Sequence, residues 1–185
     1  MNVFLSQPCL DVLRRVLPWV FPPPHPVVQD PTKPVVERFV SNVNVNVFES
    51  FEALNVEGLK VITLPVMHGE DLVSYGFAFT VGKTNIVYLS DISRMLPETL
   101  NYIQNQLPPT DILVVDALHA TGKHPVHFSL EQTVECVQQI KPKRTYIVGI
   151  SCDSFPPHDE MNQQLEAQYG KNVIQFAHDG LSIDC

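Results

Sequence analysis

The second half of the chain alternates between segments with helical and with strand-like patterning. Apolar residues at helical spacing predict helices over 96–107, 129–140 and 159–170. Runs rich in Val, Ile and Tyr predict strands over 111–117, 144–151, 172–177 and 181–185. Helices that alternate with strands in this way cover the faces of a sheet. We therefore predict a layered α/β fold.

The middle of the chain is patterned as antiparallel strands. Four segments have strand patterning: 42–49, 59–66, 74–81 and 85–91. The turn "GKTN" at 82–85 joins the last two and predicts a hairpin. The segment "NVNVNVFE" at 42–49 alternates polar and apolar residues, so we expect one buried and one solvated face.

The N-terminal region combines a helix with a proline-rich segment. Apolar spacing over 6–21 predicts a short helix with Ser6 as its cap. Residues 22–34 contain six prolines, which deny the backbone helical geometry and ladder donors. We expect an extended loop there. The whole chain, 185 residues long, has the size of a single domain.

Charge and cysteine content restrict the classes of partner. The formal net charge of -8 argues against nucleic acid as a partner, since its phosphates require clustered Lys and Arg. No apolar run reaches the roughly 20 residues that span a bilayer, so we expect no membrane partner. The four cysteines are scattered without a C-x-x-C pair, which is typical of a reducing compartment. We expect a soluble, cytoplasmic protein.

Polar residues gather where predicted strands end. The four groups are His68, Asp91, Asp116 with His119, and Cys152 with Asp153 and His158. Ligands in α/β proteins bind at strand ends, where loops converge on a rigid sheet. Two histidines, His124 and His127, follow in the loop before the helix at 129–140.

Each of these residues also has a structural explanation. His68 precedes a glycine and could be a hydrogen-bonded turn residue. Asp91 could cap a helix that begins near Met95, because Asp is a preferred capping residue. The histidines at 119, 124 and 127 could belong to a solvated loop, since no ligand signature places them on one helical face. His25 and His178 are expected at the surface or in structural roles, and Cys136 in the core.

Several motifs in family order resemble the metallo-β-lactamase fold hydrolases. They are "LPVMHGEDLVSYGFAF", "IVYLSDISRMLPETL", "DILVVDALHATGKHPVHFSLEQTVECVQQIKPKRTYIVGIS" and "FAHDGLSI", and they run from about residue 58 to the C-terminus. The branch that contains the phosphodiesterase of the carbon-phosphorus lyase pathway is the most similar, and tRNA 3′-processing nucleases are more distant. The resemblance implies an αβ/βα sandwich with two divalent ions, zinc or manganese, at one edge.

The resemblance also implies roles for individual residues. His68 matches a metal-binding histidine, and Asp91 matches the aspartate that bridges the two ions. His127 matches a histidine that donates a proton or positions phosphate, so we expect it to be catalytic. Asp116, His119 and His124 would surround these groups without binding metal themselves.

The last metal histidine of the family has no direct counterpart. The phosphodiesterase branch carries it where this chain has Gly149, and other branches carry it where this chain has Cys152. His158, or the thiolate of Cys152, could take its place. Both alternatives are open, with His158 slightly favoured.

The defining H-x-H-x-D-H motif of the family does not occur in the sequence. The resemblance would place it upstream of Met1, so we expect a partial sandwich that lacks N-terminal strands and most ligands of one ion. We therefore expect weak or no metal binding by this chain alone. Exposed apolar area would favour marginal stability or self-association into a homo-oligomer.

Three functional hypotheses follow. The first is a metal-dependent hydrolase of a small-molecule phosphodiester or related ester, incomplete or inactive as this chain alone. The second is a non-catalytic remnant of the same fold that binds a small ligand or a partner. The third is a cysteine hydrolase that uses Cys152 and His158, although this pair has no evident orienting partner.

Overall fold

The computed structural model describes residues 1–22 and 43–185, which form two compact units, Met1–Glu49 and Ser50–Cys185. Apart from Pro22, the proline-rich segment predicted at 22–34 lies outside the described residues, as does His25. No helix in the described ranges is long and apolar enough to cross a membrane.

The first unit is a small helix-and-sheet element. Strand β1 (Asn2–Ser6) pairs in parallel with β2 (Asn44–Phe48), and α1 (Gln7–Val16) follows β1 directly. Leu5, Leu10 and Phe21 form its buried core. The helix is shorter than predicted because Leu17 precedes a proline, which disfavours helical geometry. The side chain of Ser6 makes no capping hydrogen bond.

The prediction that one face of segment 42–49 is buried is wrong for β2. Only Phe48 is buried in this strand, and Val45 and Val47 are 37% and 40% exposed. The strand belongs to a sheet of just two strands, so its alternating valines have no broad apolar face to join.

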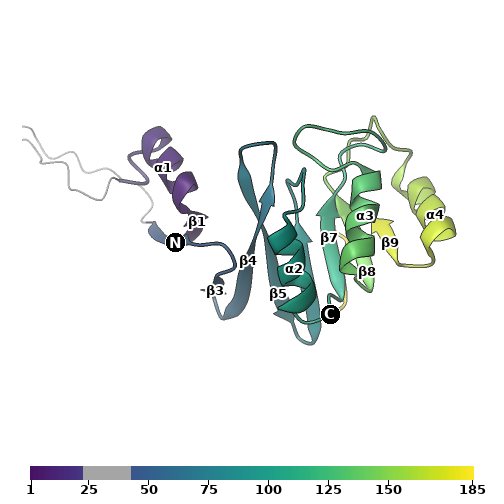
Figure 1. Cartoon of the computed structure of the whole chain (residues 1–185), viewed down its shortest axis with the longest axis horizontal. Helices are drawn as coiled ribbons and strands as arrows, with labels where there is room; N and C mark the ends of the chain where they lie inside the picture. The colour runs from purple at the N-terminus through teal and green to yellow at the C-terminus, as the bar shows by residue number, and fades with distance from the viewer. Residues whose placement is uncertain (23–42) are drawn as a thin grey trace, which may run out of the picture. The chain divides into compact units, whose positions relative to one another are not determined.

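The second unit is built on a seven-stranded mixed sheet (Figure 1). Its strands lie in sequence order: β3 (Ala53–Val56), β4 (Leu59–Met67), β5 (Val73–Val81), β6 (Thr84–Leu89), β7 (Ile112–Asp116), β8 (Arg144–Val148) and β9 (Ile174–Phe176). Pairing is antiparallel from β3 to β6 and parallel from β6 to β9. The hairpin predicted at 82–85 is confirmed, since Val81 pairs with Thr84 across a two-residue loop.

Two strand predictions need correction. The sequence pattern does not predict β3, a strand of only four residues. The strand predicted at 181–185 is wrong, because these residues form no strand. The backbone N–H of Leu181 donates to the carbonyl oxygen of His178 in a turn, so it is not offered to a neighbouring strand.

Three helices pack on the sheet and bury its core. They are α2 (Pro97–Asn105), α3 (Leu130–Ile140) and α4 (His158–Tyr169). Alternate strand residues such as Leu64, Val66 and Leu113 pack in one cluster with residues of all three helices. Cys136 of α3 is 3% exposed, which confirms its prediction as a core residue, and burial raises the pKa of its thiol to about 12.

The strand directions bring several loops to one edge of the sheet. β6, β7 and β8 are parallel, and β4 has the same direction because both β4 and β6 are antiparallel to β5. The carboxyl ends of these four strands therefore lie along a common edge. The polar residues that follow them in sequence are placed there together.

Candidate functional site

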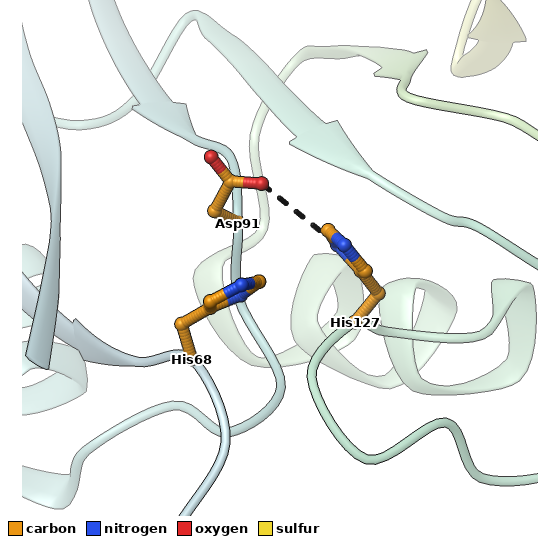
Figure 2. Close-up of side chains that lie close together, drawn as sticks. All are labelled: His68, Asp91 and His127. Carbon is orange, nitrogen blue, oxygen red and sulfur yellow. Dashed lines mark ion pairs between the residues drawn. The ribbon is translucent and has the colours of Figure 1, made fainter. Parts of the chain in front are cut away.

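His68, Asp91 and His127 converge at this edge from three separate segments. His68 follows β4, Asp91 follows β6, and His127 lies between β7 and α3. One ligand atom from each residue can be chosen so that all three atoms lie within 4.8 Å of one another. Figure 2 shows the three side chains pointing toward a shared space. This is the one such group of three in the described part of the chain.

His68 is held in place by its backbone, while one nitrogen of its ring has no hydrogen-bond partner among the described residues. Its backbone N–H donates to the carbonyl oxygen of Leu72 at 2.8 Å. Its Nδ1 atom is buried and makes no hydrogen bond to any described residue. A purely structural turn histidine would normally satisfy that nitrogen. The unpartnered nitrogen therefore favours a ligand role over the structural explanation.

Asp91 does not cap a helix. Helix α2 begins at Pro97, and its N-cap is Leu96, which makes no side-chain capping bond. Asp91 has a left-handed backbone with φ of 54°, a conformation that aspartate tolerates better than most residues. Its side chain is 63% exposed, and one carboxylate oxygen, Oδ1, lies 4.0 Å from Nδ1 of His127. The structure therefore excludes the capping explanation.

His127 is oriented by the buried carboxylate of Asp116. Its Nδ1 atom lies 2.7 Å from Oδ2 of Asp116, a distance typical of a charge-assisted hydrogen bond. We assign the proton to Nδ1, which leaves Nε2 without a protein partner among the described residues. Asp116 is 2% exposed, and its other oxygen, Oδ1, is buried without a hydrogen bond. Burial raises the pKa of Asp116, and the hydrogen bond to His127 opposes that shift.

His119 and His124 lie beside this group without joining it. Their rings are 5.3 Å apart, and the His124 ring is 5.5 Å from that of His127. Nδ1 of His119 lies 2.7 Å from the hydroxyl oxygen of Ser154. Desolvation, followed by repulsion from His119, His127 and His68, lowers the pKa of His124. Since His119 and His127 make specific side-chain bonds, the solvated-loop explanation does not hold for them.

The two candidates for the last metal ligand lie outside the group of three. His158 begins α4, and its Nε2–H donates to the carbonyl oxygen of Ala177 at 3.1 Å. Cys152 is exposed and belongs to no group of potential ligands among the described residues. The structure therefore brings neither residue together with His68 and Asp91. It also gives the Cys152–His158 pair no support, because no hydrogen bond joins these two side chains in the described part of the chain.

Gly149, where the phosphodiesterase branch carries its last histidine, has a backbone suited to glycine. Its φ is 65°, in the left-handed region. A Cβ atom at this position would lie 3.2 Å from Cβ of Asp116, which is tighter than an ordinary contact. A histidine here would require both the backbone and Asp116 to adjust.

Sequence reasoning does not single out Ser93, which joins two of the converging segments. The Ser93 hydroxyl donates to the carbonyl oxygen of Met67 at 3.1 Å and accepts from the backbone N–H of Gly69 at 2.8 Å. It thus ties the segment after Asp91 to the residues on either side of His68. Its position two residues after Asp91 was the available signal.

The donor set of the group fits a divalent metal ion. Two imidazoles and a carboxylate are common ligands of zinc, manganese and iron. A carboxylate that holds one ring nitrogen of a histidine, as Asp116 holds His127, is a frequent arrangement around metal sites. The unpartnered Nδ1 of His68 is consistent with the same chemistry.

Solved structures share this fold. A diphosphatase of the PhnP family is 28% identical, with a TM-score of 0.72, and the match covers 100% of this chain and 58% of that one. Zn²⁺-bound PqqB from Methylobacterium extorquens is 16% identical, with a TM-score of 0.66 and coverage of 100% and 65%. The short form of human tRNase Z is 13% identical, with a TM-score of 0.60 and coverage of 100% and 67%. At these identities the last two show likeness of fold alone.

The chain spans 58% and 63% of the length of the first two solved structures that it resembles. No curated protein sequence matches it. The family model described as the beta-lactamase superfamily domain matches residues 1–150. Because this match covers most of the chain, the resemblance inferred from the motifs is confirmed, and the protein belongs to the beta-lactamase superfamily.

Proposed function

We propose that this chain carries the metal site of a hydrolase that cleaves a phosphodiester or diphosphate bond. The observation that carries the proposal is the convergence of His68, Asp91 and His127 within 4.8 Å at one edge of the sheet. The superfamily match and the likeness to a diphosphatase of 28% identity support this reaction class.

His68 and Asp91 would bind the ion, with zinc and manganese as the expected metals. A divalent ion held there would supply positive charge to the phosphoryl group and lower the pKa of a water molecule. His127 would serve as proton donor. Its Nδ1–H is engaged by Asp116, so Nε2 is the atom available to the substrate.

The leaving group of the reaction needs a proton, and His127 would supply it. Hydrolysis would form a bond from a water oxygen to phosphorus and break the bond from phosphorus to the leaving oxygen, and the attacking water would release one proton to solvent. The leaving oxygen would require a proton, and His127 in its imidazolium form, with Nδ1–H held by Asp116, would donate the proton on Nε2. General acid catalysis of this kind contributes about 10²- to 10⁴-fold.

Metal binding tests the proposal independently of catalysis. The missing motif led us to expect weak or no metal binding, whereas the convergence of His68, Asp91 and His127 leads us to propose that the wild-type chain binds one ion, measured by isothermal titration with ZnCl₂ and with MnCl₂. His127→Gln should retain that ion and lose hydrolysis of bis(p-nitrophenyl) phosphate by about 10²-fold or more. His178→Gln is the matched control, because His178 lies in the exposed C-terminal segment. Absence of metal binding in the wild-type chain would refute the proposal, and loss of the ion in His127→Gln would make His127 a ligand instead.

The second candidate is a ligand-binding protein of the same fold without catalysis. The placement of Gly149, Cys152 and His158 favours it, because none of them completes the metal site. The two functions are separated by the bis(p-nitrophenyl) phosphate assay at saturating zinc or manganese. Bound metal without any turnover would favour the second.

A further inference from the structure

A cavity of about 620 Å³ lies directly beside the group of three. The residues that line it belong to the segments that carry His68, Asp91 and His127 and to one face of α3. The lining includes, among others, Gly69, Arg94, Met95, Lys123, His124 and Glu135. We call it the α3 cavity. Neither His68, Asp91 nor His127 lines it, so it is a neighbouring compartment and not the metal site itself.

His124 connects the two compartments. It lines the α3 cavity, and its ring centroid lies 5.5 Å from that of His127. A substrate whose reacting phosphorus lies beside His127 can therefore extend past His124 into the cavity. The part of the substrate attached to the leaving oxygen would occupy this space.

Two cations of the cavity have no ion-pair partner among the described residues. Arg94 and Lys123 are exposed, and neither forms an ion pair with a residue in the described ranges. The backbone at Arg94 is fixed, because its carbonyl oxygen accepts the N–H of Met67 at 3.1 Å. A guanidinium on a rigid segment is suited to bind phosphate oxygens in a defined geometry.

The cavity also contains two carboxylates and two amides. Glu70 and Glu135 carry the negative charges, and Gln132 and Gln139 supply the amides. The two positive and two negative side chains balance in formal charge, so the cavity does not select a ligand by negative charge alone. Such a lining suits a ligand with both phosphate oxygens and hydroxyl groups, because carboxylates and amides accept hydrogen bonds from sugar hydroxyls.

We propose that the α3 cavity binds a second phosphoryl group of the substrate through Arg94 and Lys123. The substrates would then be diphosphate diesters that carry a sugar, and simple phosphodiesters would bind more weakly. This inference rests on the proposed function and specifies the substrate class of the same site.

Metal-free binding tests the inference separately from catalysis. Isothermal titration in the presence of EDTA would compare ADP-ribose, a diphosphate diester, with AMP, which lacks the second phosphoryl group. ADP-ribose should bind more tightly than AMP. Arg94→Gln and Lys123→Gln should each weaken ADP-ribose binding by about tenfold, the loss expected for one hydrogen bond to a charged group.

Charge-preserving variants and a distant control make the result specific. Arg94→Lys and Lys123→Arg should retain more affinity than the glutamine variants. Lys83→Gln, an exposed lysine in the turn between β5 and β6, should bind ADP-ribose as the wild type does. Equal affinities of the wild type and both cavity glutamine variants, or AMP binding as tight as ADP-ribose binding, would overturn the inference. Failure of zinc and manganese to bind would refute the proposed function and leave this metal-free result standing.

Discussion

Oδ2 of Asp116 lies 2.7 Å from Nδ1 of His127, at the point where β7 ends. The carboxylate is buried, so solvent competes little for this hydrogen bond. The backbone carbonyl of the same residue accepts the hydroxyl of Thr133 in α3 at 2.8 Å, which fixes the strand end against the helix. Asp116 is thus a rigid support that sets the tautomer and the direction of the His127 ring.

Asp116→Asn should uncouple His127 from this support. An amide can donate to Nδ1, which favours the opposite tautomer of the ring. Losses upon removal of such supporting groups are typically about 10- to 100-fold, and we expect a loss of this size in hydrolysis of bis(p-nitrophenyl) phosphate. The pH profile of the rate should change as well, which a purely structural role would not produce. Asp179→Asn, in the exposed C-terminal segment, is the control. An unchanged rate with an unchanged profile would contradict the assignment.

Asp91→Asn should remove metal affinity and leave the fold intact. Asparagine tolerates the left-handed backbone found at this position, so the substitution changes the charge without adding strain. Loss of an anionic ligand should weaken zinc binding by roughly 100-fold or more, beyond the effect of a supporting group. Titration calorimetry measures the affinity, and circular dichroism checks the fold. Zinc binding equal to that of the wild type would remove Asp91 from the site.

Asp111 should make stability depend on pH. It accepts the backbone N–H of Asn85 at 2.8 Å and pairs with Lys143 at 2.6 Å, and these two contacts lower its pKa from the ordinary value of 3.8. The contribution of Asp111 to the free energy of unfolding is therefore fully present above the pKa of the unfolded state. It disappears as the pH falls through the lower pKa of the folded state. Asp111→Asn should be less stable than the wild type at pH 7, and the difference should shrink below pH 3.8.

Urea denaturation at pH 7, 5 and 3 measures this difference. Asp153→Asn, an exposed carboxyl, serves as the control and should show no comparable trend. A difference between wild type and Asp111→Asn that stays constant over this range would rule out the electrostatic explanation.

Gly76→Ala should destabilise the sheet next to the site. A Cβ atom at Gly76 would lie 2.5 Å from Cδ2 of Leu89 and 2.6 Å from the carbonyl oxygen of Tyr88, so β6 would have to shift away from β5. Overpacking of this kind costs about 1–3 kcal/mol in the free energy of unfolding. Ser74→Ala on the same strand should change it by less than about 0.5 kcal/mol. Equal denaturation midpoints for the two variants would show that the sheet accommodates the extra methyl group.

Local patterning was sufficient for most of the elements that surround the site. The apolar spacing of 129–140 predicts α3, and the structure adds a capping box between Ser129 and Gln132 at its start. The "GKTN" hairpin was predictable because turn chemistry depends on a few neighbouring residues. The short strand β3 and the exposure of β2 could not be predicted from the local sequence. A strand of four residues depends on the neighbouring strand that pairs with it, and the exposure of a strand depends on the elements that cover it.

The sequence by itself determined the strand and helix order, the superfamily resemblance and the candidates His68, Asp91 and His127. Only the tertiary structure decided that these three converge, that Asp116 holds His127, that His158 turns toward Ala177, and that Arg94 and Lys123 line one cavity. The physical reason is the separation along the sequence over which each kind of interaction acts. Helix and turn preferences act over a few residues, whereas contacts such as His68 with His127 join segments that meet only after the whole sheet has formed.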